Sequence, residues 1–254
     1  TDNKMLSYDF RASATYNKTF NNTHIINLYG GMSVNKIDRH NTWFRGWGLQ
    51  YDMGMEPYYD YLAFKQGMES GSKYYTIGDS FYREVAFFFN GTYSYKGRYT
   101  INGTYRYEGT NKMGKSRKAR WLPTWNISGA WNVHEEKFFS HVQPALSHLS
   151  LKASYSLTAD RGPSYVTNSL AVIKASTPWR PTSGDTETGL KVSSLENAQL
   201  TYEKKHELNL GLDVGFVNNR INLAFDWYKR NNFDLIGTVT TQGIGGEISK
   251  YGNV

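Results

Sequence analysis

The sequence predicts an all-β chain in which antiparallel, up-and-down strands form part of a transmembrane β-barrel. Apolar and polar side chains alternate with period two through most of the 254 residues, and almost no helical period is present. Short turns rich in Asn and Gly alternate with long connections. The composition includes 20 Tyr, 7 Trp and 24 Gly at a mean hydropathy of −0.61, which indicates many half-exposed aromatic side chains rather than a compact soluble core.

The alternating segments define about eight strands, each with one apolar and one polar face. In residues 125–133, Trp125, Ile127 and Trp131 share one face, because side chains in a strand alternate between its two sides. Most runs have the length of about 9–11 residues that a tilted strand needs to cross a bilayer. The eight predicted strands lie within residues 8–18, 24–34, 83–97, 99–109, 125–133, 149–157, 206–216 and 220–230.

Charged residues within these strands fall on the polar face, except at the strand ends, and the strand ends also carry aromatic residues. A charge at the lipid-facing midplane of a barrel costs about 2–4 kcal/mol. The core of a soluble β-sandwich also excludes charge, so this pattern alone leaves a soluble sheet open. The polar-face charges are Arg11, Arg106, Lys152, Asp213 and Asp226. The aromatic residues that suit a membrane interface are Tyr93, Tyr95, Tyr99, Tyr107, Trp131 and Trp227.

The connections between the strands differ in length in a regular way. Tight hairpin turns are predicted at 21–22, 96–97 and 218–219, because Asn and Gly tolerate positive φ. The connection that begins at His134 is intermediate and has room for one helical turn. Short turns on one side and long extracellular loops on the other are typical of outer-membrane barrels. The predicted long loops lie near 41–80, 109–120, 159–199 and 237–254.

The polar face predicts a wide barrel. Its side chains are mostly small, as at Ser128, Ala130, Ser154 and Gly211. A barrel of only eight strands has an interior that side chains must fill, and these residues would leave it underfilled. We therefore expect residues 1–254 to form one arc of a larger barrel domain.

The sequence contains no recognisable catalytic or metal-binding signature. Cysteine is absent, which excludes disulfides and thiolate metal sites. His134 and His141 are too far apart for a zinc-binding helix, and neither a nucleophile elbow nor a phosphate-binding loop is present. The net charge of +7 fits a solvated basic surface. We expect no enzyme activity, no cofactor, no metal and no nucleic-acid partner.

Several spaced motifs occur in the order found in one known family. Residues 120–139, RWLPTWNISGAWNVHEEKFF, contain an Arg-Trp pair, a Pro, a GAWN strand end and an acidic Phe-Phe turn. Residues 197–236 contain LTYEK before a tight turn and DWYKRNNFDL after it. With residues 98–112 and 149–162, these motifs resemble the SusC/RagA family of TonB-dependent outer-membrane transporters from Bacteroidota. The resemblance covers most of residues 81–254, whereas residues 1–80 match only in style.

The resemblance implies a middle-to-late portion of a 22-stranded barrel in the bacterial outer membrane. It also implies active import of oligosaccharides or peptides, with a SusD-like surface lipoprotein and TonB as partners. We find no TonB box and no plug domain in residues 1–254, so we expect TonB to act through segments absent from this chain. A soluble or surface β-rich glycan-binding module and a passive porin remain the alternatives.

Three of the predicted loops contain candidate contact residues. Aromatic side chains can stack on sugar rings, dock a partner or pack on neighbouring loops, and all three roles stay open. A basic loop on the outside would meet lipopolysaccharide phosphates, although a merely solvated loop explains the same residues. The substrate or partner candidates are Trp43, Phe44, Trp47, Tyr58, Tyr59, Trp179 and Arg180, and the lipopolysaccharide candidates are Lys115, Arg117 and Lys118.

Overall fold

The computed structural model of the chain divides into two compact units. The described residues are 1–45, 49–50, 52, 54–57, 60–70, 72, 74–113, 117–143, 145–162, 171–176, 189–243 and 248–254. The first unit consists of Thr1–Asp9, Asn35–Arg83 and Ile173–Lys191, and the second of Phe10–Val34, Glu84–Val172 and Val192–Val254.

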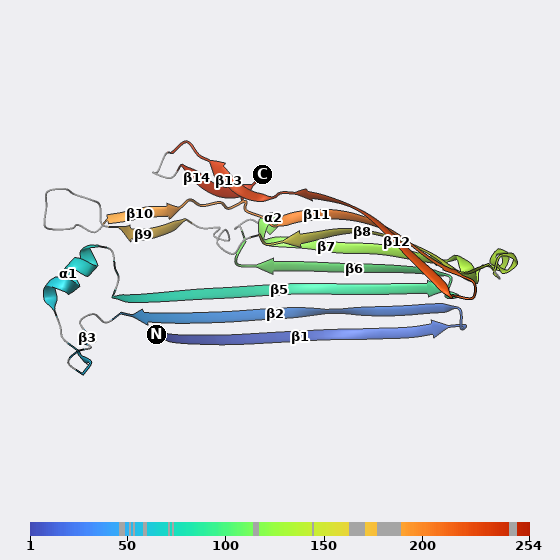
Figure 1. Cartoon of the computed structure of the whole chain (residues 1–254), viewed down its shortest axis with the longest axis horizontal. Helices are drawn as coiled ribbons and strands as arrows, with labels where there is room; N and C mark the ends of the chain where they lie inside the picture. The colour runs from blue at the N-terminus through green and yellow to red at the C-terminus, as the bar shows by residue number, and fades with distance from the viewer. Residues whose placement is uncertain are drawn as a thin grey trace. The chain divides into compact units, whose positions relative to one another are not determined.

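An eight-stranded sheet dominates the fold and confirms the all-β, up-and-down prediction (Figure 1). Its strand order follows the order in the chain, and every pair from β5 to β12 whose register is defined is antiparallel. The strands are β1 (Asp2–Phe20), β2 (His24–Phe44), β5 (Tyr75–Tyr95), β6 (Tyr99–Thr110), β7 (Trp121–Asn132), β8 (Leu146–Asp160), β11 (Glu203–Phe216) and β12 (Ile221–Phe233).

Smaller elements occupy the connections between these strands. None of the helices in the described part of the chain has the length and apolar composition needed to cross a bilayer. Three two-stranded sheets are formed by β3 (Leu49–Gln50) with β4 (Glu56–Pro57), β9 (Val172–Ser176) with β10 (Gly189–Ser194), and β13 (Ile236–Thr240) with β14 (Ser249–Asn253). The helices in the described residues are α1 (Tyr61–Glu69), α2 (Arg117–Arg120), η2 (Val133–Glu135) and η3 (Lys137–His141).

The tight turns form where the sequence predicts them. Asn21 and Asn22 have φ values of 49° and 51°, and Lys96 and Gly97 have 52° and 69°. The third turn spans Val217–Asn219, and all three residues have positive φ. Asn and Gly adopt this region readily, whereas a β-branched residue such as Val217 does so rarely. Asn residues therefore set the place of the first and third turns and Gly97 that of the second, and the third turn also includes Val217, a less suitable residue.

Two strands extend well into the first predicted loop. Because β2 ends at Phe44 and β5 begins at Tyr75, the connection spans residues 45–74 rather than 41–80. Residues 75–82 (YTIGDSFY) contain Gly78 and Asp79, which are unusual in strands, so their alternation is weak. Backbone pairing with a neighbouring strand stabilises this segment despite its poor side-chain pattern.

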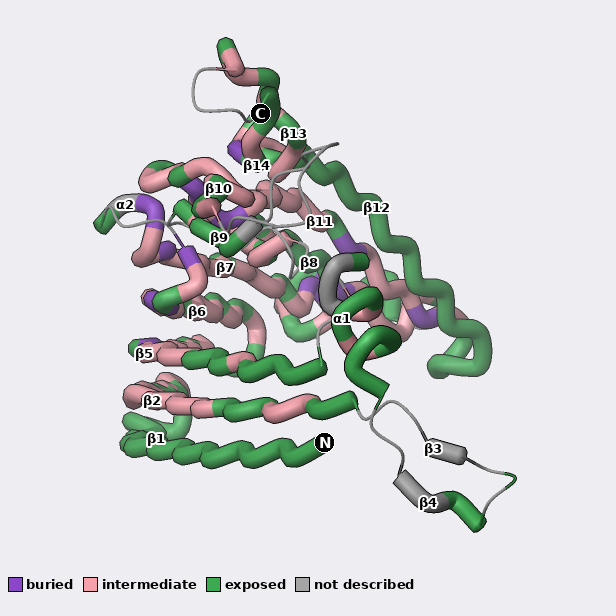
Figure 2. Tube along the Cα trace, turned by 90° about the vertical axis from the view of Figure 1, so that its left-hand side faces the viewer, coloured by how far each residue is buried: buried purple, intermediate pink, exposed green. Residues whose placement is uncertain are grey.

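Burial is concentrated in the second unit near the ends of β6, β7 and β8. Strands β1 and β12 are exposed along almost their whole length (Figure 2). The buried cluster consists of Met113, Leu122 and Tyr202, with Ala159 packed against it. Leu200 is also almost fully buried. The bases of the long connections, rather than the middle of the sheet, therefore form the closest-packed part of the described structure.

Candidate functional site

The middle of the polar face of the second unit is a hydrogen-bonding surface made mainly of uncharged side chains. The Nδ2 atom of Asn102 donates to Oγ1 of Thr92 at 2.6 Å. A hollow of about 330 Å³ lies over this region and is also bordered by Lys152 and Asp226. Because amides and hydroxyls both donate and accept hydrogen bonds, this surface suits water or a polar solute. One register row across it consists of Thr92, Asn102, Ser128, Ser154 and Asn209.

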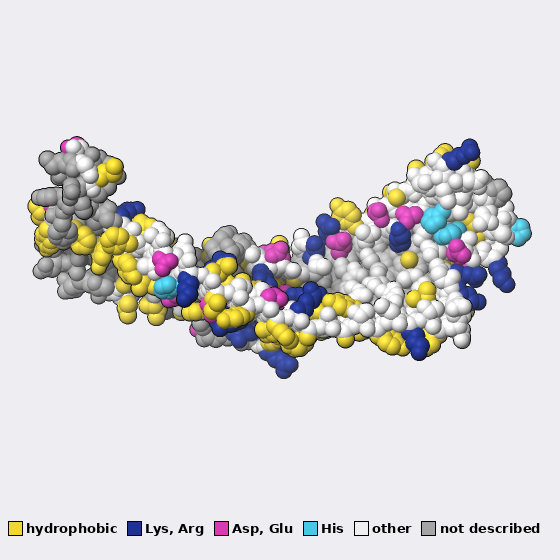
Figure 3. All heavy atoms as spheres, turned by 90° about the horizontal axis from the view of Figure 1, so that it is seen from below, with side chains coloured by type: hydrophobic (Ala, Val, Ile, Leu, Met, Phe, Trp, Pro, Cys, Tyr) yellow, Lys and Arg dark blue, Asp and Glu magenta, His cyan; other side chains and the backbone are white. Residues whose placement is uncertain are grey.

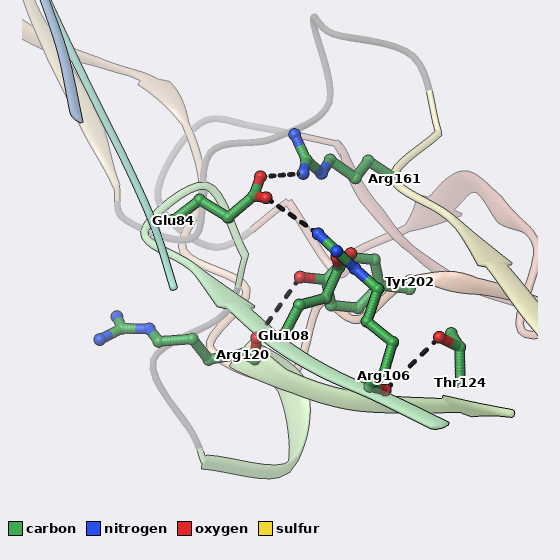
Figure 4. A network of polar contacts seen from close by, with 7 residues as sticks. All are labelled: Glu84, Arg106, Glu108, Arg120, Thr124, Arg161 and Tyr202. Atoms are coloured by element: carbon green, nitrogen blue, oxygen red, sulfur yellow. Dashed lines mark hydrogen bonds and ion pairs between the residues drawn. The ribbon is translucent and has the colours of Figure 1, made fainter. Parts of the chain in front are cut away.

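A network of charged side chains lies at the long-connection end of the polar face (Figure 4). Arg106 donates from Nε to Oε2 of Glu108 at 2.6 Å and from Nη2 to Oε1 of Glu84 at 3.2 Å. Arg161, just after β8, donates to the other oxygen of Glu84. Since β6 and β7 separate β5 from β8, this ion pair ties the start of a long connection back to β5.

Sequence reasoning did not identify this network. The sequence hints at it only through Glu84, Arg106 and Glu108, which lie near predicted strand ends on one face. Nothing in the sequence places Arg161 beside Glu84, 77 residues away. The two arginines are about 40 % exposed and the two glutamates about 15 %. The network therefore presents guanidinium groups to the space above the polar face and holds the carboxylates beneath them.

The opposite face is apolar across the second unit. Figure 3 shows hydrophobic side chains gathered along one margin of the sheet and acidic side chains toward the other. The registers join the apolar positions of successive strands into continuous rows. Two of these rows are Tyr105, Trp125, Leu157 and His206, and Tyr99, Trp131, Leu151, Leu212 and Phe225.

Aromatic rings form a belt at each end of this apolar face. Near the long connections, Tyr107 stacks on Trp121 with 5.0 Å between the ring centroids. In the same belt, His206 stacks on Tyr155 at 5.5 Å and on Phe233 at 5.1 Å. This placement of His206 was not predicted, and its Nδ1 atom has no hydrogen-bond partner among the described residues.

The second belt lies near the short turns, where Tyr99 stacks on Trp131 at 6.2 Å and His24 contacts Tyr93 and Tyr95. Tyr99 and Tyr107 are eight residues apart on β6, which corresponds to about 26 Å along a strand. With the tilt of about 40° found in barrels, this distance spans about 20 Å, close to the roughly 25 Å apolar band of outer-membrane barrels.

Trp227 does not belong to either belt, contrary to its predicted position near a strand end. It is paired with Leu210 in the middle of β12. The predicted strand ended at residue 230, but pairing of Lys204 with Phe233 extends β12 beyond it. The length of the partner strand, rather than the local alternation, therefore decides which aromatic residues lie at the ends.

The acidic turn after β7 is anchored by one carboxylate. Glu136 accepts hydrogen bonds from the hydroxyl of Tyr99 and from Nε1 of Trp131 at 3.4 Å, and Arg98 lies 3.4 Å from its Oε2 atom. The hydrogen bond from Tyr99 lowers the pKa of Glu136 below its ordinary value, with further lowering by Trp131 and Arg98. The turn is thereby fixed to the short-turn belt.

We expect the thermal stability of the intact protein to depend on the charge of Glu136. Because the folded-state pKa is lowered, its contribution is complete above the unfolded value of about 4.3 and is lost as pH falls through the folded value. Thermal unfolding from pH 7 to pH 3 should therefore show a lower Tm for Glu136→Gln than for the wild type at neutral pH. The two should converge as the pH falls below the folded-state pKa of Glu136.

Glu135→Gln is the matched control for this experiment, because its exposed carboxylate faces His134 at 3.6 Å instead of the Tyr99–Trp131 pair. A difference between Glu136→Gln and the wild type that does not narrow at all as the pH is lowered into the acid range would contradict the assignment.

The structure describes only some of the predicted contact residues. Trp43 is partly buried, with the guanidinium of Arg45 above its ring at 4.8 Å, and Phe44 at the end of β2 is 61 % exposed. Arg117 is exposed at the start of α2, which also contains Lys118. Trp47, Tyr58, Tyr59, Lys115, Trp179 and Arg180 lie outside the described residues. The contacts predicted for these residues with substrate, partner or lipopolysaccharide therefore stay predictions.

The described part of the chain contains no group of three or more His, Cys, Asp or Glu side chains placed to hold a metal ion. The paired charges and the polar surface described above are suited to binding and positioning of a solute.

Comparisons with known proteins agree with the geometry, although no protein-family profile matches the chain. The chain is 26 % identical to TonB-dependent receptor P3 of Formosa agariphila over 87 % of its own length and 21 % of that protein. It is 31 % identical to TonB-dependent receptor SusC of Bacteroides thetaiotaomicron over 126 residues, 49 % of the chain and 12 % of that protein. The predicted resemblance to the SusC/RagA family is confirmed.

Solved structures show the same fold. The RagAB peptide importer in its closed-closed state aligns with 99 % of the chain at a TM-score of 0.78 and 21 % identity. The chain covers 26 % of that protein chain, so it spans about a quarter of the solved importer chain and about a fifth of TonB-dependent receptor P3. The proteins named here are receptors or transporters, and none of them is named as an enzyme.

Proposed function

We propose that this chain forms part of the barrel wall of a TonB-dependent transporter in the bacterial outer membrane. The observation that carries the proposal is the apolar face bounded by two aromatic belts, opposite a polar face rich in Asn and Ser. Aromatic belts of this kind flank the lipid-facing band of outer-membrane barrels. In this arrangement the Asn- and Ser-rich face lines the path of the solute.

The imported solute is an oligosaccharide or a peptide, and a SusD-like surface lipoprotein delivers it. Support comes from the similarity to SusC and to a RagAB complex that is described as a peptide importer. TonB supplies the energy through parts of the protein outside residues 1–254. The polar hollow beside Asn102 and Asn209 offers hydrogen bonds to a passing solute of either class.

The long connections face the outside of the cell in this proposal. Trp43 and Phe44, with Trp47, Tyr58, Tyr59, Trp179 and Arg180, form the candidate contacts with substrate or lipoprotein. Stacking of Arg45 on Trp43 supports an ordered aromatic surface at the end of β2. Lys115, Arg117 and Lys118 are the candidate contacts with lipopolysaccharide phosphates, which pair well with ammonium and guanidinium groups.

Uptake by cells tests this proposal directly. Cells that express the full-length protein should accumulate either a fluorescent oligosaccharide mixture or a fluorescent peptide mixture, and deletion of its gene should abolish the uptake. A protonophore should abolish the same uptake, because import through TonB depends on the proton motive force.

Uptake that persists in the presence of the protonophore would identify a passive porin. Purification provides a second criterion, because the apolar face requires detergent or lipid. An intact protein that is folded and monomeric in plain buffer would overturn the membrane assignment in favour of a soluble binding module.

A further inference from the structure

The apolar face contains a groove of about 890 Å³ in the middle of the second unit. This volume lies within the range of roughly 300–1,000 Å³ that is typical of small-molecule sites. Gly129 and Ala153 are adjacent in the register and form its floor. The bulky side chains around this floor are Tyr99, Ile101, Trp131, Leu151, Leu210 and Trp227.

The groove results from two small residues within a row of large ones. Ile101 is paired with Gly129, Gly129 with Ala153, Ala153 with Leu210, and Leu210 with Trp227. A Cβ atom placed on Gly129 would have the carbonyl oxygen of Thr100 as its nearest neighbour, at 3.8 Å. The space above Gly129 is therefore open rather than filled by a neighbouring side chain.

The polar atoms around the groove already have partners within the protein. The hydroxyl of Tyr99 and Nε1 of Trp131 both donate to Glu136. Lys152, which also borders the groove, pairs through Nζ with Asp213. An occupant of this groove thus needs to bury hydrocarbon and needs few hydrogen-bonding groups of its own.

We propose that the groove binds one acyl chain of a phospholipid from the leaflet on the short-turn side. The proposal rests on the proposed function, because it requires the apolar face to meet the membrane. The groove includes Tyr99 and Trp131 of the short-turn belt, and the exposed basic residues Lys96 and Lys137 lie at that same end of the strands. An anionic headgroup is favoured beside these cations while its acyl chain lies in the groove.

Native mass spectrometry of the full-length protein tests this site. The protein is reconstituted into vesicles of dioleoyl phosphatidylethanolamine and dioleoyl phosphatidylglycerol and then extracted with a mild detergent. Gly129→Leu fills the floor of the groove from β7, and Ala153→Leu fills it from β8. The fraction of protein that carries a bound phospholipid should be about tenfold lower in each variant than in the wild type. The reason is that the new side chain displaces about two methylene groups of the lipid.

Gly103→Leu is the matched control. Gly103 lies on the same apolar face, paired with Ile127, and a Cβ atom there meets nothing within 4 Å. This variant adds the same side chain outside the groove and should retain phospholipid like the wild type.

The outcomes separate this inference from the proposed function. If the wild type inserts into the vesicles but all variants retain equal amounts of phospholipid, the groove proposal is wrong and the membrane assignment stands. If the wild type does not insert, both fail. A wild-type dimer that dissociates in Gly129→Leu would instead show that a second copy of the protein occupies the groove, and would overturn the lipid assignment.

Discussion

Ile127→Arg is expected to lower the free energy of unfolding of the membrane-inserted protein by about 2–4 kcal/mol, the cost of a cation at the lipid-facing midplane of a barrel. Ile127 is 58 % exposed on the apolar face and is paired with Gly103 on β6. Gly103 lies four residues from Tyr99 and four from Tyr107, so Ile127 is level with the middle of the band between the two belts. Urea titration of the protein in vesicles, followed by tryptophan fluorescence, measures the change.

Ser128→Arg is the control for this substitution. It adds the same side chain one residue along β7, on the polar face, where small partners Asn102 and Ser154 leave space. We expect a change within about 0.5 kcal/mol, as for an ordinary exposed substitution. Equal destabilisation by the two arginines would show that the apolar face does not meet lipid.

Tyr202→Ala is expected to lower the free energy of unfolding by about 3–5 kcal/mol, the range for removal of a large aromatic side chain from a packed core. Tyr202 is 1 % exposed and packs with Met113 and Leu122 at the bases of two long connections. The loss should appear as a lower urea midpoint, accompanied by faster proteolysis within residues 109–120.

Tyr202→Phe distinguishes packing from hydrogen bonding at this position. The variant keeps the ring and removes the hydroxyl, which contacts the carbonyl oxygen of Arg120 at 3.5 Å. A hydrogen bond contributes about 0.5–1.5 kcal/mol, so the Phe variant should lose no more than that. A Phe variant as unstable as the Ala variant would mean that the hydroxyl, rather than the ring, stabilises this cluster.

The strand pattern and the turns were predictable because both depend on neighbours along the chain. Alternation at Trp125, Ile127 and Trp131 identifies one face of β7 without knowledge of its partners. The positive φ of Asn21 and Asn22 follows from the residue type. The ends of β2, β5 and β12 were less predictable, because pairing with a neighbouring strand extends a segment beyond its own alternation.

The sites depended on information that no local pattern contains. The belt position of His206, between Tyr155 and Phe233, requires the register of three strands. The ion pair of Glu84 with Arg161 requires the connection after β8 to return across two strands. The groove over Gly129 and Ala153 exists because two small residues of different strands are adjacent in the register.

The sequence by itself determined that the chain forms amphipathic strands joined by alternating short and long connections, with charge kept off one face. It did so because strand periodicity and turn conformation are local properties of the backbone. Only the tertiary structure decided which aromatic residues share a belt, which charges pair and where the apolar face is hollow. Those features arise from the register between strands, which is fixed by hydrogen bonds between segments far apart in the chain.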